Sequence, residues 1–241
     1  MQEKELKTSV GQRVAIGLIA FLMLGSIIAS YAAIIANNSK SSDSSSSKLS
    51  DERMKYYEDK YAKAASNFKE VSKSDYETFS QYLSDVKAYN ETSANESGVQ
   101  AHDLLKGTGR TLGEKDGDYL AYYVGWCADE TIFSSSLDND KNPSSFVGAL
   151  DVSQGVIEGW YYGMEGARLG GVREITVPGN LAYANQKEVC GGYNKPLKFL
   201  VMAVPAEDPL KTAASDVYMA EWLLGVAMQG IDYEKEATTQ Q

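Results

Sequence analysis

Hydrophobic and polar positions divide the chain into three stretches of different texture. Residues 14–36 carry no charged side chain and are dominated by apolar ones. Residues 51–96 mix charged side chains with apolar ones at spacings of three and four, which is the period of an amphipathic helix. From residue 97 onward, short runs of branched and aromatic residues alternate with glycine-containing connections, a pattern typical of strands. The pattern therefore predicts an apolar helix, a helical arm and a sheet domain, in that order.

The apolar stretch 14–36 is long enough to cross a bilayer, since a helix of that length spans about 34 Å at about 1.5 Å per residue. A secretory signal has an apolar region of only about 7 to 15 residues, so we expect an uncleaved anchor. Cleavage near Ser30-Tyr31-Ala32 is the alternative. A buried core helix is a third interpretation, which the charged residues 1–13 and the serine-rich stretch 37–50 disfavour.

More basic residues precede the span than follow it closely, which predicts a cytoplasmic start at residues 1–13 and an extracytoplasmic bulk. The serine-rich residues 37–50 lack the apolar side chains needed for a core and are expected to form a flexible linker. Small residues at four-residue multiples, Gly17, Gly25, Ala29 and Ala33, are typical of paired membrane helices. A homodimer through this helix is therefore an open alternative. The helical arm 51–96 is expected to pack on the domain that follows it, and a homodimer or partner contact through the arm is the alternative.

The soluble part is expected to combine helices and strands. In the arm 51–96, one helix starts near Asp51, and Ser74-Asp75-Tyr76-Glu77 has the form of a capping box that opens a second helix. In the sheet domain 97–206, strands are predicted at 99–105, 119–127, 172–177 and 197–204, with one short helix at 156–164. In the region 207–241, apolar residues spaced by three and four beyond Pro209 predict a carboxy-terminal helix that packs on the domain or on the arm.

Composition excludes several chemistries. The formal net charge is -10 and the basic residues form no cluster, so nucleic acid is not an expected partner. With His102 as the one histidine and two cysteines 63 positions apart, the chain offers no ligand set for zinc or haem, and we expect no cofactor. Cys127 and Cys190 are expected to be separate thiols, with a disulfide as the alternative if the domain lies in an oxidising compartment.

Motifs in the second half of the chain occur in the order and approximate spacing of the FKBP-type peptidyl-prolyl cis/trans isomerases, and residues 97–205 resemble that family. The matching motifs are Leu104-Leu105-Lys106-Gly107-Thr108-Gly109, Tyr123-Val124-Gly125, Ile132-Phe133-Ser134-Ser135-Ser136, Val156-Ile157-Glu158-Gly159-Trp160, Gly170-Gly171-Val172-Arg173-Glu174-Ile175-Thr176-Val177-Pro178 and Leu181-Ala182-Tyr183. The resemblance implies an α+β fold, in which an antiparallel half-barrel sheet wraps across a short helix.

The resemblance also implies an aromatic pocket that receives a proline ring, with Trp160 as its floor. By motif position, the residues expected to catalyse are Tyr123, Phe133, Ile157, Trp160 and Tyr183. Those expected to bind substrate are Ser134, Phe146, Val156, and Phe199 or Val201, which are alternatives because the last strand can slide by two residues. Ile157 would offer its backbone N–H and Tyr183 its hydroxyl to the carbonyl groups that flank the proline. Such a site needs neither a nucleophile nor a metal ion, because rotation about a peptide bond breaks no covalent bond.

The sequence departs from the family pattern at two places. Ser134 stands where the family usually has an aspartate, and the loop after Tyr183 lacks the apolar residues that often cover the ligand. We therefore expect a membrane-tethered isomerase, active on proline-containing polypeptides and assisting the folding of exported proteins, whose activity is weak. The alternative is an FKBP-like binding module or chaperone with little or no catalysis.

Overall fold

The structure is a computed structural model that describes residues 49–138, 143–184 and 189–232. It divides into two compact units. In the described residues, the first unit comprises the chain from Lys73 to Glu207, and the second combines residues 49–72 with residues 208–232. The expected anchor at 14–36, the start at 1–13 and nearly all of the linker at 37–50 lie outside the described residues. None of the helices in the described part is long and apolar enough to cross a membrane.

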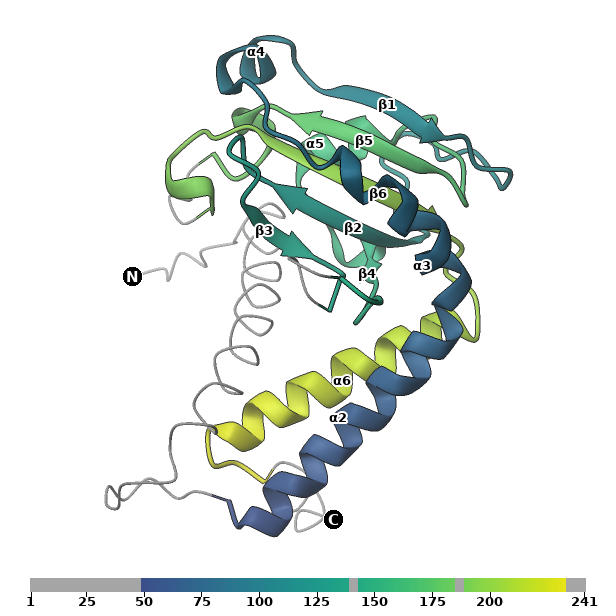
Figure 1. The fold of residues 1–241 in the computed structure, drawn as a ribbon, viewed down its shortest axis with the longest axis vertical. Coiled ribbons are helices and arrows are strands. Elements are labelled where there is room, and N and C mark those ends of the chain that lie inside the picture. Colours follow the sequence, from purple (N-terminus) through teal and green to yellow (C-terminus); the bar gives the residue numbers. More distant parts are fainter. Residues whose placement is uncertain (1–48, 139–142, 185–188, 233–241) are drawn as a thin grey trace, which may run out of the picture. The chain divides into compact units, whose positions relative to one another are not determined.

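The first unit is built on an antiparallel sheet in the spatial order β1-β5-β6-β2-β3, with β4 pairing to β2 (Figure 1). Its strands are β1 (Gln100–Leu105), β2 (Leu120–Trp126), β3 (Ile132–Ser135), β4 (Leu150–Asp151), β5 (Val172–Val177) and β6 (Leu197–Val204). The four predicted strands are present as β1, β2, β5 and β6. The short strands β3 and β4 were not predicted, because neither has enough residues for a period to be recognised.

One face of this sheet packs on the short helix α5 (Glu158–Met164), as the resemblance implies. Alternate residues of β2, β5 and β6, among them Tyr123, Ile175 and Phe199, form a buried core with Trp160 of the helix. Arg173 of β5 fixes the carboxy-terminal end of α5, since its guanidinium donates to the carbonyl oxygens of Gly163 (3.0 Å) and Glu165 (2.9 Å). These contacts hold α5 against the sheet and position the residues at its start.

The opposite face of the sheet is also covered, in part by the second half of the predicted arm. The covering residues belong to α3 (Lys73–Phe79), which continues into the 3-10 helix Ser80–Asp85, and to the stretch around Phe146. The Phe146 ring stacks on Tyr122 at a centroid distance of 3.8 Å and contacts Tyr76 and Phe79 at 5.4 Å each. This corrects the expectation for Phe146. Because Tyr122 and Tyr123 point to opposite faces of β2, a ring stacked on Tyr122 lies away from the face that carries Tyr123.

The second unit is a pair of helices, α2 (Asp51–Val71) and α6 (Leu210–Met228), which run side by side in Figure 1. Tyr57 of α2 packs with Leu223 and Leu224 of α6. Arg53 and the Tyr57 hydroxyl both bond to Asp232, at N–O and O–O distances of 2.6 to 2.7 Å. The predicted carboxy-terminal helix is therefore present and packs on part of the predicted arm. The arm itself does not form one unit, because α3 and α4 (Glu91–Glu96) belong to the sheet unit.

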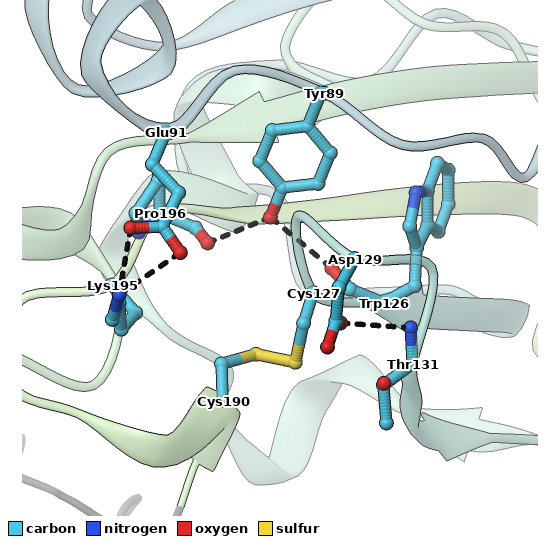
Figure 2. The surroundings of a disulfide bond; sticks show 9 residues. All are labelled: Tyr89, Glu91, Trp126, Cys127, Asp129, Thr131, Cys190, Lys195 and Pro196. Carbon is cyan, nitrogen blue, oxygen red and sulfur yellow. Dashed lines mark hydrogen bonds and ion pairs between the residues drawn. A yellow bond between two sulfur atoms is a disulfide. The ribbon is translucent and has the colours of Figure 1, made fainter.

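A disulfide joins Cys127, just after β2, to Cys190 in the loop that precedes β6 (Figure 2). The expectation of two separate thiols is therefore wrong, and the alternative is confirmed. The bond closes a loop of 63 residues and ties the sheet to a stretch with little regular structure of its own. In Figure 2 the Tyr89 hydroxyl, next to the disulfide, donates to the carbonyl oxygens of Pro196 (2.8 Å) and Trp126 (3.3 Å).

We expect the double variant Cys127→Ser/Cys190→Ser to lose about 2 to 4 kcal/mol of unfolding free energy, because the bond restricts the unfolded chain across a long loop. Urea unfolding measures this loss. Reductant should lower the midpoint of the wild type to that of the variant and leave the variant unchanged. Equal midpoints for the oxidised wild type and the variant would contradict the prediction.

Candidate active site

A small, mainly apolar pocket opens between the sheet and the start of α5. Its cavity volume is only about 10 Å³. The residues that line it are Tyr123, Phe133, Ser134, Leu150, Val156, Ile157, Trp160, Tyr183 and Phe199. They come from β2, β3, β4, β6, the start of α5 and the segment after the 3-10 turn Gly179–Leu181. The structure thus brings together most of the residues that the resemblance assigned to one site.

Trp160 lies at the base of this pocket and is only 2% exposed. Its ring meets Phe199 and Tyr123 edge-on, at centroid distances of 5.2 and 5.7 Å. The indole Nε1–H donates to the Tyr119 hydroxyl at 3.0 Å, so its polar edge is satisfied inside the core. The indole is therefore held on several sides and presents a fixed apolar surface to the cavity.

Phe133 forms one wall of the pocket and contacts two other aromatic residues. Its ring lies 5.7 Å from Phe199 and 6.5 Å from Tyr183, each close to perpendicular. Gly125 makes this arrangement possible, because a Cβ atom there would lie only 2.8 Å from the rings of both Phe133 and Phe199. A larger residue at this position would push the wall into the pocket.

Two hydrogen-bond donors at the pocket are left unused by the described part of the protein. Ile157 precedes the first residue of α5, and its backbone N–H has no partner among the described residues. The same holds for the Tyr183 hydroxyl. Burial raises the pKa of Tyr183 above its ordinary value near 10, so the hydroxyl stays protonated at neutral pH and can donate. A carbonyl-bearing ligand would satisfy both donors.

The serine that departs from the family pattern lies inside the pocket. The Ser134 Oγ is 2.6 Å from the Tyr123 hydroxyl, and either atom can be the donor. A neutral pair therefore occupies the place where a carboxylate would accept a charge-assisted hydrogen bond from the tyrosine. The departure therefore changes the polarity of this wall.

Two of the residues assigned to substrate binding lie elsewhere, and one lining residue was missed. Phe146 packs on the opposite face of the sheet, as described above. Val201 lies on the same face of β6 as Phe199, two residues further along the strand. It is fully buried in the core and does not line the pocket. Leu150 lines the pocket from the two-residue strand β4, which gave no periodic signal in the sequence. Among the described residues, no cluster of histidine, cysteine and acidic side chains could hold a metal ion.

The residues that line this pocket lie within the part of the chain that is similar to known proteins. The model of the FKBP-type peptidyl-prolyl cis-trans isomerase family matches residues 114–204. An FK506-binding protein of Neisseria meningitidis serogroup B is 36% identical over 86 residues, which is 36% of this chain and 74% of that protein. The chain therefore belongs to the FKBP-type peptidyl-prolyl isomerase family.

Two further similarities extend over more of the chain. A probable FKBP-type peptidyl-prolyl cis-trans isomerase, FkpA, of the same organism is 32% identical over 133 residues, which is 55% of this chain and 46% of that protein. The crystal structure of AtFKBP13 has 25% sequence identity and a TM-score of 0.35, and the match covers 46% of this chain and 94% of that chain.

Proposed function

We propose that this chain is a peptidyl-prolyl cis/trans isomerase that acts on X-Pro bonds of exported polypeptides at the outer face of the cytoplasmic membrane. The observation that carries the catalytic part is the pocket itself. An apolar base formed by Trp160 lies beside two unused donors, the Ile157 N–H and the Tyr183 hydroxyl. Membership of the family, whose members catalyse this reaction, supports the same conclusion.

The pocket's chemistry suits rotation about an amide. Resonance in the peptide bond sets a barrier of about 18–20 kcal/mol, and twisting the bond removes that resonance and its charge separation. The apolar base favours the less polar, twisted amide over the planar one. Donors fixed at the rim would hold the flanking carbonyl groups while the bond turns, and they need no reorganisation at that moment.

The proposed location rests on two features. The uncharged stretch 14–36 and the serine-rich linker would anchor the catalytic unit close to a membrane. The disulfide between Cys127 and Cys190 supports a position outside the cytoplasm, where such bonds persist. Protease added to intact cells should remove the catalytic unit from the membrane fraction. A soluble protein with a new amino terminus near Ala32 would contradict the anchor.

An FKBP-like binding module with little catalysis is a second candidate, and Ser134 is the observation that favours it. Without a carboxylate next to Tyr123, the pocket would still bind a proline side chain, but it would stabilise the twisted amide less well. A protease-coupled assay on the full chain, with a panel of X-Pro peptides, separates the two candidates. Uncatalysed exchange takes about 10–100 s, so an isomerase shortens it visibly and a binding module does not.

We expect Ser134→Asp to raise kcat/KM by about fivefold, because a charge-assisted hydrogen bond from Tyr123 exceeds a neutral one by roughly 1 kcal/mol. Ser134→Asn is the matched control, since asparagine has nearly the same size as aspartate and carries no charge. An Asp variant no faster than the Asn variant would show that the missing carboxylate does not limit this site.

We expect Tyr183→Phe to leave the urea midpoint almost unchanged, because the hydroxyl has no internal partner in the described part of the protein. The same change should lower kcat/KM by about tenfold if the hydroxyl bonds to a substrate carbonyl, which corresponds to about 1.4 kcal/mol. Steady-state rates at several peptide concentrations measure the change. Full activity in this variant would remove the hydroxyl from the mechanism.

A further inference from the structure

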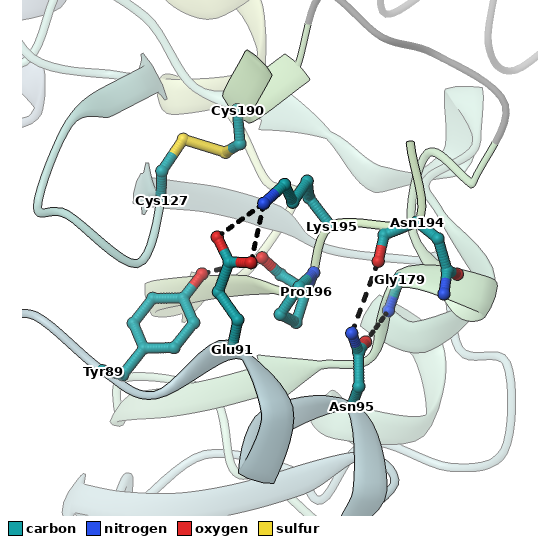
Figure 3. Close-up of polar contacts among 9 residues, drawn as sticks. All are labelled: Tyr89, Glu91, Asn95, Cys127, Gly179, Cys190, Asn194, Lys195 and Pro196. Atoms are coloured by element: carbon teal, nitrogen blue, oxygen red, sulfur yellow. Dashed lines mark hydrogen bonds and ion pairs between the residues drawn. A yellow bond between two sulfur atoms is a disulfide. The ribbon is translucent and has the colours of Figure 1, made fainter. Parts of the chain in front are cut away.

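The helix α4 lies before the residues that the family model matches, yet one of its side chains bonds to two points of the pocket region. The Asn95 Oδ1 accepts a hydrogen bond from the Gly179 N–H at 2.8 Å. The Asn95 Nδ2 donates to the Asn194 carbonyl oxygen at 3.4 Å. In Figure 3 this side chain faces both residues, which lie before and after the segment that carries Tyr183. An asparagine can do this because it is both donor and acceptor.

Gly179 and Asn194 lie in direct contact at the place where Asn95 joins them. A Cβ atom built on Gly179 would overlap the carbonyl group of Asn194. The Asn194 N–H also donates to the Ala184 carbonyl oxygen at 3.0 Å, so the chain just after Tyr183 is fastened to the same point. Tyr183 is thus held between two positions that Asn95 and Asn194 fix.

The residues around Asn95 secure the same region through other contacts. The Glu91 carboxylate of α4 pairs with the Lys195 ammonium at 2.7 and 2.9 Å. The Tyr89 hydroxyl donates to the Pro196 carbonyl oxygen at 2.8 Å. These contacts attach the residues after Asn194 to the same stretch of chain, so that α4 lies against the sheet unit independently of Asn95 (Figure 3).

Few regular backbone contacts hold residues 179–184, which carry Tyr183. Within these residues there is one 3-10 turn, Gly179–Leu181, and the Tyr183 hydroxyl has no partner in the described part of the chain. Fixed donors act in catalysis only when their supporting contacts hold them in place. The position of the Tyr183 hydroxyl must therefore depend on how the segment's ends are held.

We propose that Asn95 is a positioning residue for Tyr183, and that α4 is a functional extension of the isomerase site. Asn95 joins Gly179 to Asn194 and thereby sets where the Tyr183 hydroxyl meets the substrate carbonyl. This role rests on the proposed isomerase function, but the attachment of the Tyr183 segment by Asn95 does not depend on catalysis and is measured separately.

Hydrogen–deuterium exchange on the full chain tests the attachment. In Asn95→Ala we expect amide exchange to rise by at least about fivefold in peptides covering residues 179–184 and 189–195, with β2 and β6 unchanged. Glu96→Ala is the matched control, because Glu96 is the neighbouring exposed residue of α4. Unchanged exchange at 179–184 in Asn95→Ala would overturn the proposal, whether or not the protein is active.

A double-mutant cycle tests the role in catalysis. Asn95→Ala should lower kcat by about fivefold in the wild-type background and by less than twofold when Tyr183 is already phenylalanine. Asn95→Asp, which keeps the acceptor for Gly179, should recover part of the rate. Equal losses in both backgrounds would overturn the positioning role and indicate general destabilisation. A wild-type chain without isomerase activity would contradict the proposed function, while the exchange result would still decide the attachment.

Discussion

Trp160→Ala is expected to lower the unfolding free energy by about 3 to 5 kcal/mol, the cost of deleting a fully packed aromatic side chain. The indole is 2% exposed and contacts Phe199 and Tyr123, so its removal leaves a cavity at the centre of the core. The Tyr119 hydroxyl also loses its donor. Urea unfolding, followed by circular dichroism, measures the loss, and the pocket loses its base at the same time.

Trp160→Phe is the matched control for this change. Phenylalanine keeps one aromatic ring over the core but loses the second ring of the indole and the bond to Tyr119, so it should cost about 1 to 3 kcal/mol. A loss below about 1 kcal/mol for Trp160→Ala would mean that the indole is not packed as the structure places it.

Ile157→Pro is expected to reduce kcat/KM by about 100-fold, the effect of removing one fixed donor from a catalytic site. Proline has no N–H, and its φ of about −65° matches the φ of −61° that Ile157 adopts before α5. The Ile157 N–H bonds to no described residue, so its replacement breaks no internal hydrogen bond. The loss should therefore fall on catalysis rather than on folding.

Ile157→Ala is the control for the lost side chain, because alanine removes the same apolar contacts and keeps the donor. Activity of the proline variant should lie well below that of the alanine variant, while their urea midpoints should be similar. Equal rates for the two variants would show that the N–H takes no part in the reaction.

The strands β1, β2, β5 and β6 and the short helix could be predicted from the sequence because each has a clear local signal, whereas β3 and β4 are too short to show one. Apolar runs define β2, β5 and β6, and the motif around Trp160 marks α5. Phe146 could not be placed, because its side of the sheet depends on a long polar stretch between β3 and β4 that has no period. The cover that it forms with Tyr76 and Phe79 joins segments far apart in the chain.

Long-range polar contacts could not be predicted from the sequence either. Asn95 and Gly179 are separated by 84 positions, and nothing in the residues near Asn95 marks it as a partner of the pocket. Cys127 and Cys190 left two interpretations open, because pairing depends on the conformation of a loop without a hydrophobic pattern. Both features became visible only when the fold brought the segments together.

Exchange NMR spectroscopy of an X-Pro peptide with the full chain tests the central claim most directly, since it observes both isomers at equilibrium. Catalytic amounts of the wild type should shorten cis/trans exchange from about 10–100 s to well below that range. Ile157→Pro at the same concentration should leave exchange near the uncatalysed rate. Exchange that the wild type does not accelerate would contradict the isomerase assignment, and acceleration that Ile157→Pro retains would contradict the site.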